Sequence, residues 1–369
     1  MMEINMNRTS LLYAAMAIMT FEALADGSKN FDVLANLDIG PGNVTVTSTG
    51  RVIMSQHQFY QPQYTVVEYK NQAIVPFPNK EMVSVDSTAA IKLDSVLGIR
   101  ADNNGIVWML DNGMRSGVTP KLVGWNINTN KLQRLIYLPA PITPKDAFVN
   151  DFALDTNHNY AFISDPAGGK NAALIVVNLS TGTARRVLEG HHSVLPEDID
   201  LIIDNVPIQI KKQSGELVKP HIGVNPITED LVNKWVYFGP MHGLSLYRIK
   251  AEDLINESLT SQELASHVER YSDKPISDGI TIDENNNIYL GDLANNAIGV
   301  IDTNRQFKQL AKCPRLSWVD SFSFGDEGQL YAVVNRLHQS AILNGGNNQS
   351  KPPYFLLKIK ALSAGMPGR

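Results

Sequence analysis

Aspartate, asparagine and histidine recur at one position of a repeated hairpin pattern, and they are the side chains of this sequence best placed to do chemistry. Six hairpins can be aligned on the residue that opens the turn, taken as Thr47, Asp102, Asp155, Asn225, Asp283 and Gly325. The residues five and four positions earlier are then Gly42-Asn43, Leu97-Gly98, Asn150-Asp151, Pro220-His221, Asp278-Gly279 and Asp320-Ser321. Each polar residue alone could simply cap the start of a strand. As a group they predict a ligand site, because buried carboxylates are costly without a cation or hydrogen-bond donors.

The elements that must position these side chains are short strands with a period of two. The second strands of the hairpins recur at intervals of 42 to 75 residues, which suits about four strands per repeat. This spacing predicts an all-β, six-bladed β-propeller as a single domain over residues 26–369, with each hairpin forming the inner two strands of a blade. A pair of β-sandwiches or a large barrel is the alternative. Residues 250–271 have helical spacing and predict short surface helices.

In a propeller the innermost strands line the central channel, so polar strand starts that are distant in sequence meet at one mouth. Pairing across the hairpins also places Asp320 near Asn335, and Asn150 near Asp165. Asp278 or Asp320 could then move a proton next to a carbonyl group, a role that needs a carboxylate of raised pKa within hydrogen-bond reach. These two aspartates are the candidate catalytic residues.

The N-terminus and the composition restrict compartment and partners. Arg8, an apolar run over residues 11–19 and Ala23-Leu24-Ala25 predict a secretory signal peptide over residues 1–25, and therefore a secreted or periplasmic protein. No later stretch approaches the length of a membrane span. The net charge of −5 argues against nucleic acid as a partner, and the single cysteine, Cys313, excludes an intramolecular disulfide.

Several stretches together resemble the major royal jelly/yellow protein family in its bacterial form, dopachrome-tautomerase-related type: "LGIRADNNGIVWMLDNG", "DFALD", "AFISDPAGG", "NNAIGVIDT" and "LYAVVNRLH". The resemblance covers about Val96 to Leu337 and implies a secreted, monomeric six-bladed propeller with a central ligand cavity. Some salivary members of the family bind biogenic amines, and the matching positions here are Asn335, Leu337 and Asp320. With the aligned strand starts, the expected ligand-binding residues are Asn150, Asp151, His221, Asp320, Asn335 and Leu337.

A more distant resemblance concerns "SDGITIDENNNIYLGD", which is similar to the metal-binding strand start of the gluconolactonase/senescence-marker lactonase family. It implies a divalent metal, Ca²⁺ or another ion, on Asp278 and Asn150. Two of that family's four ligands are missing, because Asn43 stands near the expected Glu and Val96-Leu97 stand where an Asn belongs. No cofactor is certain from the sequence.

Two functions follow as hypotheses. The first is an exported propeller that binds a small organic ligand in its central channel, with isomerisation of a catechol or indole-like compound as a further activity. The alternative is a metal-dependent lactonase, in which the ion polarises the ester carbonyl and activates water. Whether the protein is an enzyme is left open by the sequence.

Overall fold

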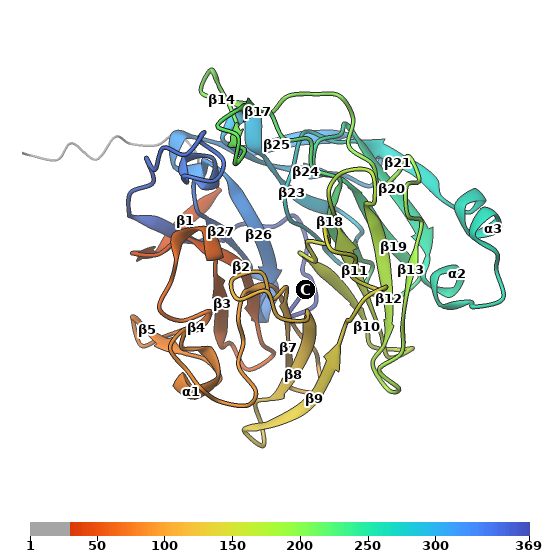
Figure 1. Ribbon diagram of the computed structural model, residues 1–369, viewed down its shortest axis with the longest axis horizontal. Helices are drawn as coiled ribbons and strands as arrows, with labels where there is room; N and C mark the ends of the chain where they lie inside the picture. Colours follow the sequence, from red (N-terminus) through yellow and green to blue (C-terminus); the bar gives the residue numbers. More distant parts are fainter. Residues whose placement is uncertain (1–29) are drawn as a thin grey trace, which may run out of the picture.

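The computed structural model describes residues 30–369, and six four-stranded antiparallel sheets are arranged around a central axis (Figure 1). The predicted six-bladed β-propeller is confirmed, and the sandwich and barrel alternatives are excluded. The predicted signal peptide lies outside the described residues. Blades 1 to 5 are each built from four consecutive strands: β2 (Pro41–Val46), β3 (Val52–Gln56), β4 (Val66–Lys70) and β5 (Ala73–Pro76); β6 (Val96–Ala101), β7 (Ile106–Asp111), β8 (Lys121–Asn126) and β9 (Lys131–Tyr137); β10 (Phe152–Asp155), β11 (Tyr160–Asp165), β12 (Ala173–Asn178) and β13 (Ala184–Val187); β18 (Val224–Glu229), β19 (Trp235–Pro240), β20 (Ser245–Lys250) and β21 (Glu269–Asp273); β22 (Ile280–Ile282), β23 (Ile288–Asp292), β24 (Ala297–Ile301) and β25 (Phe307–Lys312).

Blade 6 joins the two ends of the described chain. Its inner strands are β26 (Val319–Phe324), β27 (Leu330–Val334) and β28 (Tyr354–Ile359), and its outermost strand is β1 (Phe31–Leu37). β1 pairs antiparallel with β28, with Phe31 opposite Ile359 and Leu37 opposite Tyr354. This pairing closes the ring without leaving the outer edge of β28 open.

The inner strands are buried on both faces. Every residue of β2, β6, β10, β18 and β22 is buried, and their apolar side chains pack between neighbouring blades. With no face turned to solvent, these strands depart from strict polar/apolar alternation. The polar residues they carry therefore lie inside the protein.

Short helices occupy the loops. The predicted helical stretch forms α2 (Ala251–Ile255) and α3 (Ser261–Ser266) on the outer edge of blade 4 (Figure 1), and α3 begins with a capping box between Thr260 and Glu263. The remaining helical segments are α1 (Lys80–Val83), η1 (Gln58–Tyr60), η2 (Leu293–Asn295), η3 (Pro314–Leu316), η4 (Asp326–Gly328) and η5 (Leu337–Gln339). Within the described residues, no helix is long and apolar enough to cross a membrane.

An insertion between β13 and β18 forms two small hairpins, which we call the cap (residues 201–218). Its strands are β14 (Ile202–Ile203), β15 (Val206–Pro207), β16 (Ile210–Lys211) and β17 (Leu217–Val218). The backbone of Gln209 exchanges hydrogen bonds with Leu343 and Gly345 in the loop between β27 and β28, at 2.9 and 2.8 Å. The cap is thereby fixed to blade 6, and its Leu201, Ile203 and Ile208 are buried against one end of the propeller.

The last residues of the chain run into the axis, where the C-terminus lies at the centre of the ring (Figure 1). Ala101 N–H donates to the Gly368 carbonyl at 3.3 Å, and the Arg369 guanidinium donates to the carbonyls of Leu154 and Asp230, both at 2.9 Å. Ala101 and Leu154 belong to the far ends of the inner strands. The tail therefore closes the end of the channel opposite to the strand starts.

Candidate functional site

A cavity of ≈ 300 Å³ lies beneath the cap, at the starts of the inner strands. Its lining includes the apolar side chains of Phe59, Phe148, Ile222, Met241, Trp318 and Leu343. Four polar side chains from successive blades, Asn150, Asn225, Asp278 and Asp320, also line it. Its volume is at the lower end of the range for small-molecule sites, and an apolar wall with a few convergent polar groups is typical of such sites.

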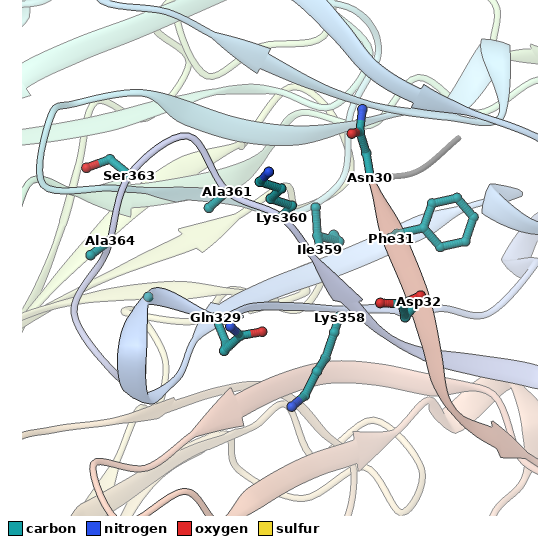
Figure 2. Close-up of a pocket in the computed structure, with 11 residues that line it drawn as sticks. Asn30, Phe31, Asp32, Gln329, Lys358, Ile359, Lys360, Ala361, Ser363 and Ala364 are labelled. Atoms are coloured by element: carbon teal, nitrogen blue, oxygen red, sulfur yellow. The ribbon is translucent and has the colours of Figure 1, made fainter. Parts of the chain in front are cut away.

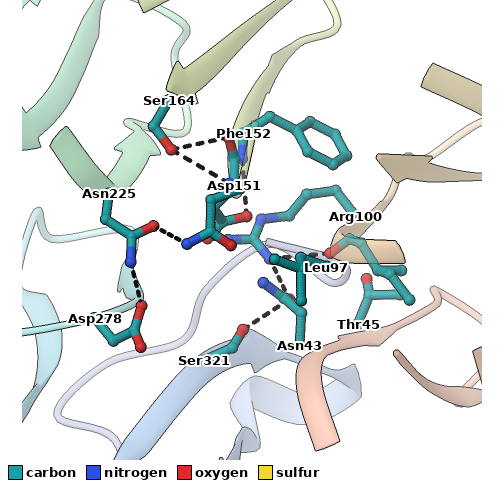
Figure 3. A network of polar contacts seen from close by, with 12 residues as sticks. Asn43, Thr45, Leu97, Arg100, Asp151, Phe152, Ser164, Asn225, Asp278 and Ser321 are labelled. Carbon is teal, nitrogen blue, oxygen red and sulfur yellow. Dashed lines mark hydrogen bonds and ion pairs between the residues drawn. The ribbon is translucent and has the colours of Figure 1, made fainter. Parts of the chain in front are cut away.

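Three of the four polar residues form a hydrogen-bonded chain (Figure 3). The Asn150 amide donates to Asn225 Oδ1, and Asn225 Nδ2 donates to Asp278 Oδ1 at 2.5 Å. Trp318 Nε1 donates to the second oxygen, Asp278 Oδ2, at 2.8 Å. The Asp278 carboxyl is thus fixed in orientation by a donor on each oxygen.

The sequence alignment predicts Asn225 at the turn of blade 4, and this prediction is wrong. The turn of blade 4 opens at Asp230, whose N–H donates to the Trp235 carbonyl at 3.0 Å and whose Oδ1 accepts from Lys234 N at 2.7 Å. Asn225 is therefore the strand start of blade 4, and the alignment that gave His221 is corrected. The Asp-x-x-Asn turn before aromatic Trp235 was a signal for this register, since it resembles the turns that precede Tyr160 and Tyr289.

His221 lies outside the cavity lining. Its ring is 3.5 Å from Asp198 Oδ1 and 3.4 Å from Asp200 Oδ1, and its side chain is partly exposed. The structure therefore gives no contact of this residue with the other expected ligand-binding side chains.

Asp320 and Asn335 are brought together, since Asn335 Nδ2 donates to Asp320 Oδ2 and also to the Pro41 carbonyl at 2.9 Å. Asn335 is completely buried, and its Oδ1 accepts from Leu337 N at 3.0 Å. Leu337 itself lines the cavity. Asn335 thus positions both the Asp320 carboxyl and the turn that carries Leu337.

Asp151 is buried and belongs to a network of polar side chains with Arg100, Asn43 and Ser321 (Figure 3). Its Oδ2 accepts from Arg100 Nη2 at 2.8 Å, and Arg100 Nη1 donates to Asn43 Oδ1 at 2.8 Å. Asn43 Oδ1 also accepts from Ser321 Oγ at 2.7 Å. This buried network ties blades 1, 2, 3 and 6 together. Asp151 is not among the residues that line the cavity, and its Oδ1 accepts from Phe152 N at 2.8 Å.

Asp165, which the sequence predicts to lie near Asn150, makes its contacts elsewhere. Asp165 accepts from Phe148 N at 2.7 Å and from Arg186 Nη1 at 2.5 Å, whereas Asn150 meets the second strand through its backbone, which donates to the Ser164 carbonyl at 3.1 Å. Asp165 is fully buried and secures the loop before β10. It is not among the side chains that line the cavity.

The two cavity carboxyls are electrostatically coupled. Burial, together with the charge of Asp151, raises the pKa of Asp278 to about 7, although the hydrogen bonds from Trp318 and Asn225 lower it. Burial also raises the pKa of Asp320 well above its ordinary value, and the charge on Asp278 adds to this rise. Two neighbouring buried carboxyls do not both ionise readily, so the pair retains a proton near neutral pH.

The raised pKa of Asp278 predicts a pH dependence of stability. Because the folded-state pKa, about 7, exceeds the ordinary value of 3.8, the folded protein holds a proton that the unfolded chain releases between these two pH values. The contribution to stability is therefore full below pH 4 and falls as the pH rises toward 7. Urea unfolding of Asp278→Asn should lose this slope and show its greatest relative stability at pH 8. The exposed variant Asp273→Asn should keep the wild-type slope, and an unchanged slope in Asp278→Asn would contradict the assignment.

A divalent metal would have to be held by Asp278, Asp320 and the carboxamide oxygens of Asn150 and Asn225. Residues 30–369 contain no group of three or more His, Cys, Asp or Glu suited to a metal ion. Both oxygens of Asp278 already accept from N–H donors, one of them the Asn225 amide. As arranged, these residues do not fit a metal ion, because Asn225 presents an N–H donor where a metal needs an oxygen.

A second hollow of ≈ 490 Å³ lies at the rim of blade 6, between β1, β28 and the tail (Figure 2). Figure 2 shows Asp32, Lys358 and Lys360 on its walls. Asp32 and Lys360 are exposed to solvent. Polar groups in that position are screened by water, so the central cavity is the better candidate for a functional site.

These features define the class of protein as a closed six-bladed β-propeller whose central cavity carries acidic and amide side chains at the strand starts. Within that class, the family model described as "Major royal jelly protein" matches residues 94–364. The chain belongs to this family. No curated protein sequence matches it significantly.

Solved structures show the same fold at low sequence identity. A luciferin-regenerating enzyme is 12% identical with a TM-score of 0.56, and the match covers 92% of this chain and 97% of that one. A gluconolactonase from Xanthomonas campestris is 9% identical with a TM-score of 0.52, over 88% of this chain and 87% of that one. The suspected distant relation to gluconolactonase-like propellers is therefore present at the level of fold.

Proposed function

We propose that this protein binds a small organic molecule in the central cavity, and that the molecule has an apolar body and a protonated amine or other hydrogen-bond donor. The observation that carries the proposal is the pair Asp278 and Asp320 on the wall of an otherwise mainly apolar cavity. Apolar side chains would take up the body of the ligand, and the acidic pair would bind its donor group. The retained proton of the pair would leave when a cation binds.

The same pair could act on a bound carbonyl compound. A carboxyl whose pKa is near 7 can take a proton from carbon and return it, which is the chemistry of a tautomerase. We propose isomerisation of a catechol-derived or indole-derived carbonyl compound as the reaction, with Asp278 or Asp320 as the group that moves the proton.

Ligand binding can be tested by calorimetry and thermal unfolding with phenethylamine, tryptamine and catechols. Each amine is paired with its neutral alcohol. We expect the amines to raise the unfolding temperature and to bind at least about tenfold more tightly than the alcohols, because only the amines form a charge-assisted pair with the acidic side chains. No shift with any compound would overturn the proposal. Proton transfer is measured in a separate experiment, as the uptake of deuterium from D₂O at the carbon next to the carbonyl group of a ligand.

The second candidate function from the sequence is a metal-dependent lactonase. The N–H groups of Asn225 and Trp318 that donate to Asp278 make this function less favoured, because they occupy the oxygens that a metal would need. Metal analysis of the purified protein, with lactone hydrolysis measured before and after chelation, decides between the two functions. Stoichiometric metal together with chelator-sensitive hydrolysis would replace the binding proposal by the lactonase.

A further inference from the structure

His57 is a cavity residue that the strand-start alignment could not reveal. It directly follows β3 of blade 1, is 5% exposed, and lines the cavity together with Phe59. Its N–H donates to the Gly40 carbonyl at 2.9 Å, and its ring packs edge-on against Phe59 with the centroids 4.5 Å apart. The position of the imidazole is therefore fixed by backbone and side-chain contacts.

The hydrogen bonds of His57 decide which ring nitrogen carries the proton. Nδ1 accepts from the backbone N–H of Phe59 at 3.2 Å and caps the short helix η1. Burial lowers the pKa of this imidazole to about 3, so the ring is neutral at physiological pH. A neutral imidazole with an accepting Nδ1 holds its proton on Nε2. No hydrogen bond within residues 30–369 uses Nε2, which leaves this N–H as a donor for a cavity ligand.

The propeller places this donor on the Asp320 side of the cavity. Blade 1 adjoins blade 6 in the ring, and Gln56, the residue before His57, pairs with Pro41. The Pro41 carbonyl accepts from Asn335, the residue that also holds Asp320. A neutral donor from blade 1 and acidic groups from blades 5 and 6 therefore line the same small cavity.

We propose that His57 is a specificity-determining residue, whose Nε2–H donates a hydrogen bond to an oxygen of the ligand. The preferred ligand is then an aromatic amine with polar groups at both ends. An ether, phenol or carbonyl oxygen at one end accepts from His57, and an ammonium group at the other end binds Asp278 and Asp320. This inference rests on the proposed function, since it names the ligand class of the same cavity.

The test compares 2-, 3- and 4-methoxyphenethylamine with the corresponding ethylphenethylamines, which have nearly the same shape but no oxygen. We expect at least one methoxy isomer to bind wild-type protein about 3- to 10-fold more tightly than its ethyl counterpart, the effect of one hydrogen bond. His57→Asn keeps an acceptor at the position of Nδ1 for Phe59 and lacks Nε2. It should bind the two members of each pair equally, whereas His57→Gln, with a donor near the position of Nε2, should keep part of the preference.

The outcomes separate this inference from the proposed function. If neither series binds, the proposed function fails. If both series bind wild-type protein equally, or if the methoxy preference survives in His57→Asn, the role of His57 is overturned while ligand binding stands. If His57→Asn does not fold, equal binding of the two series to wild-type protein still overturns the role of His57, and His57→Gln supplies the comparison when a preference is present.

Discussion

Replacing Arg100 by methionine should lower the free energy of unfolding by about 3–5 kcal/mol. Arg100 and Asp151 form an ion pair of 2.8 Å, with side chains that are 5% and 6% exposed. Removal of the guanidinium leaves a buried carboxylate without its counter-charge and Asn43 Oδ1 without one of its donors. Urea unfolding followed by tryptophan fluorescence at pH 7 measures the loss.

The pH dependence of this variant identifies the cause. Burial raises the pKa of Asp151 and Arg100 opposes that rise, so the pKa should increase further when Arg100 is gone. A raised folded-state pKa gives stability that is full at low pH and falls as the pH rises, so the deficit of Arg100→Met should grow between pH 4 and pH 7. Adding Asp151→Asn should recover part of the loss. Arg270→Met, which breaks the exposed pair with Asp273, should cost about 1 kcal/mol or less, and an equal cost in both single variants would contradict the role of burial.

Replacing Asp320 by asparagine should weaken the binding of an aromatic amine by about 30-fold or more, the usual cost of truncating one member of a buried charge pair. Asparagine keeps nearly the shape of the side chain and can still accept a hydrogen bond from Asn335, so the change isolates the charge. Wild-type affinity should also rise between pH 5 and pH 8, because the acidic pair must release its proton before it binds a cation. Calorimetry at several pH values measures both effects.

A matched control lies at the cavity rim. Asp146 also borders the cavity but is exposed to solvent, so Asp146→Asn makes the same change of charge in water and should alter the affinity by less than about threefold. Comparable losses in the two variants would show that the overall field of the protein, rather than the buried acid, attracts the ligand.

The architecture was predictable because each blade repeats the same local signals. Asp102 and Asp283 open the hairpins of blades 2 and 5 in the same way, since their side-chain oxygens accept from the backbone of the turn and from aromatic partners, Trp108 Nε1 at 3.0 Å and the Tyr289 hydroxyl at 2.8 Å. These contacts are local in sequence. Such turns, together with the regular spacing of the hairpins, make the number of blades predictable from the sequence.

The site was predictable only in part, for two physical reasons. The turn of blade 4 runs from Asp230 to Trp235 and is one residue longer than the turns that begin at Asp102 and Asp283. Asn225 resembles a turn residue in sequence, and aligning on it leads to His221 as the strand start. His57 reaches the cavity from the end of a second strand, a position that the aligned strand starts do not sample. The cap has no counterpart in the other described blades, so the repeat pattern does not predict it. Its backbone contact with Leu343 joins segments that are far apart in the chain.

The pairing of β1 with β28 also determines the order in which the protein can be completed. β1 is the first described strand to leave the ribosome, and its partner β28 is the last. During synthesis β1 has an unpaired edge while blades 1 to 5 form from contacts between nearby segments. Closure of the ring is therefore expected to be the final and slowest step of folding, and an unclosed ring exposes a strand edge to other chains. Each newly made molecule depends on β28 to complete a sheet that begins with β1.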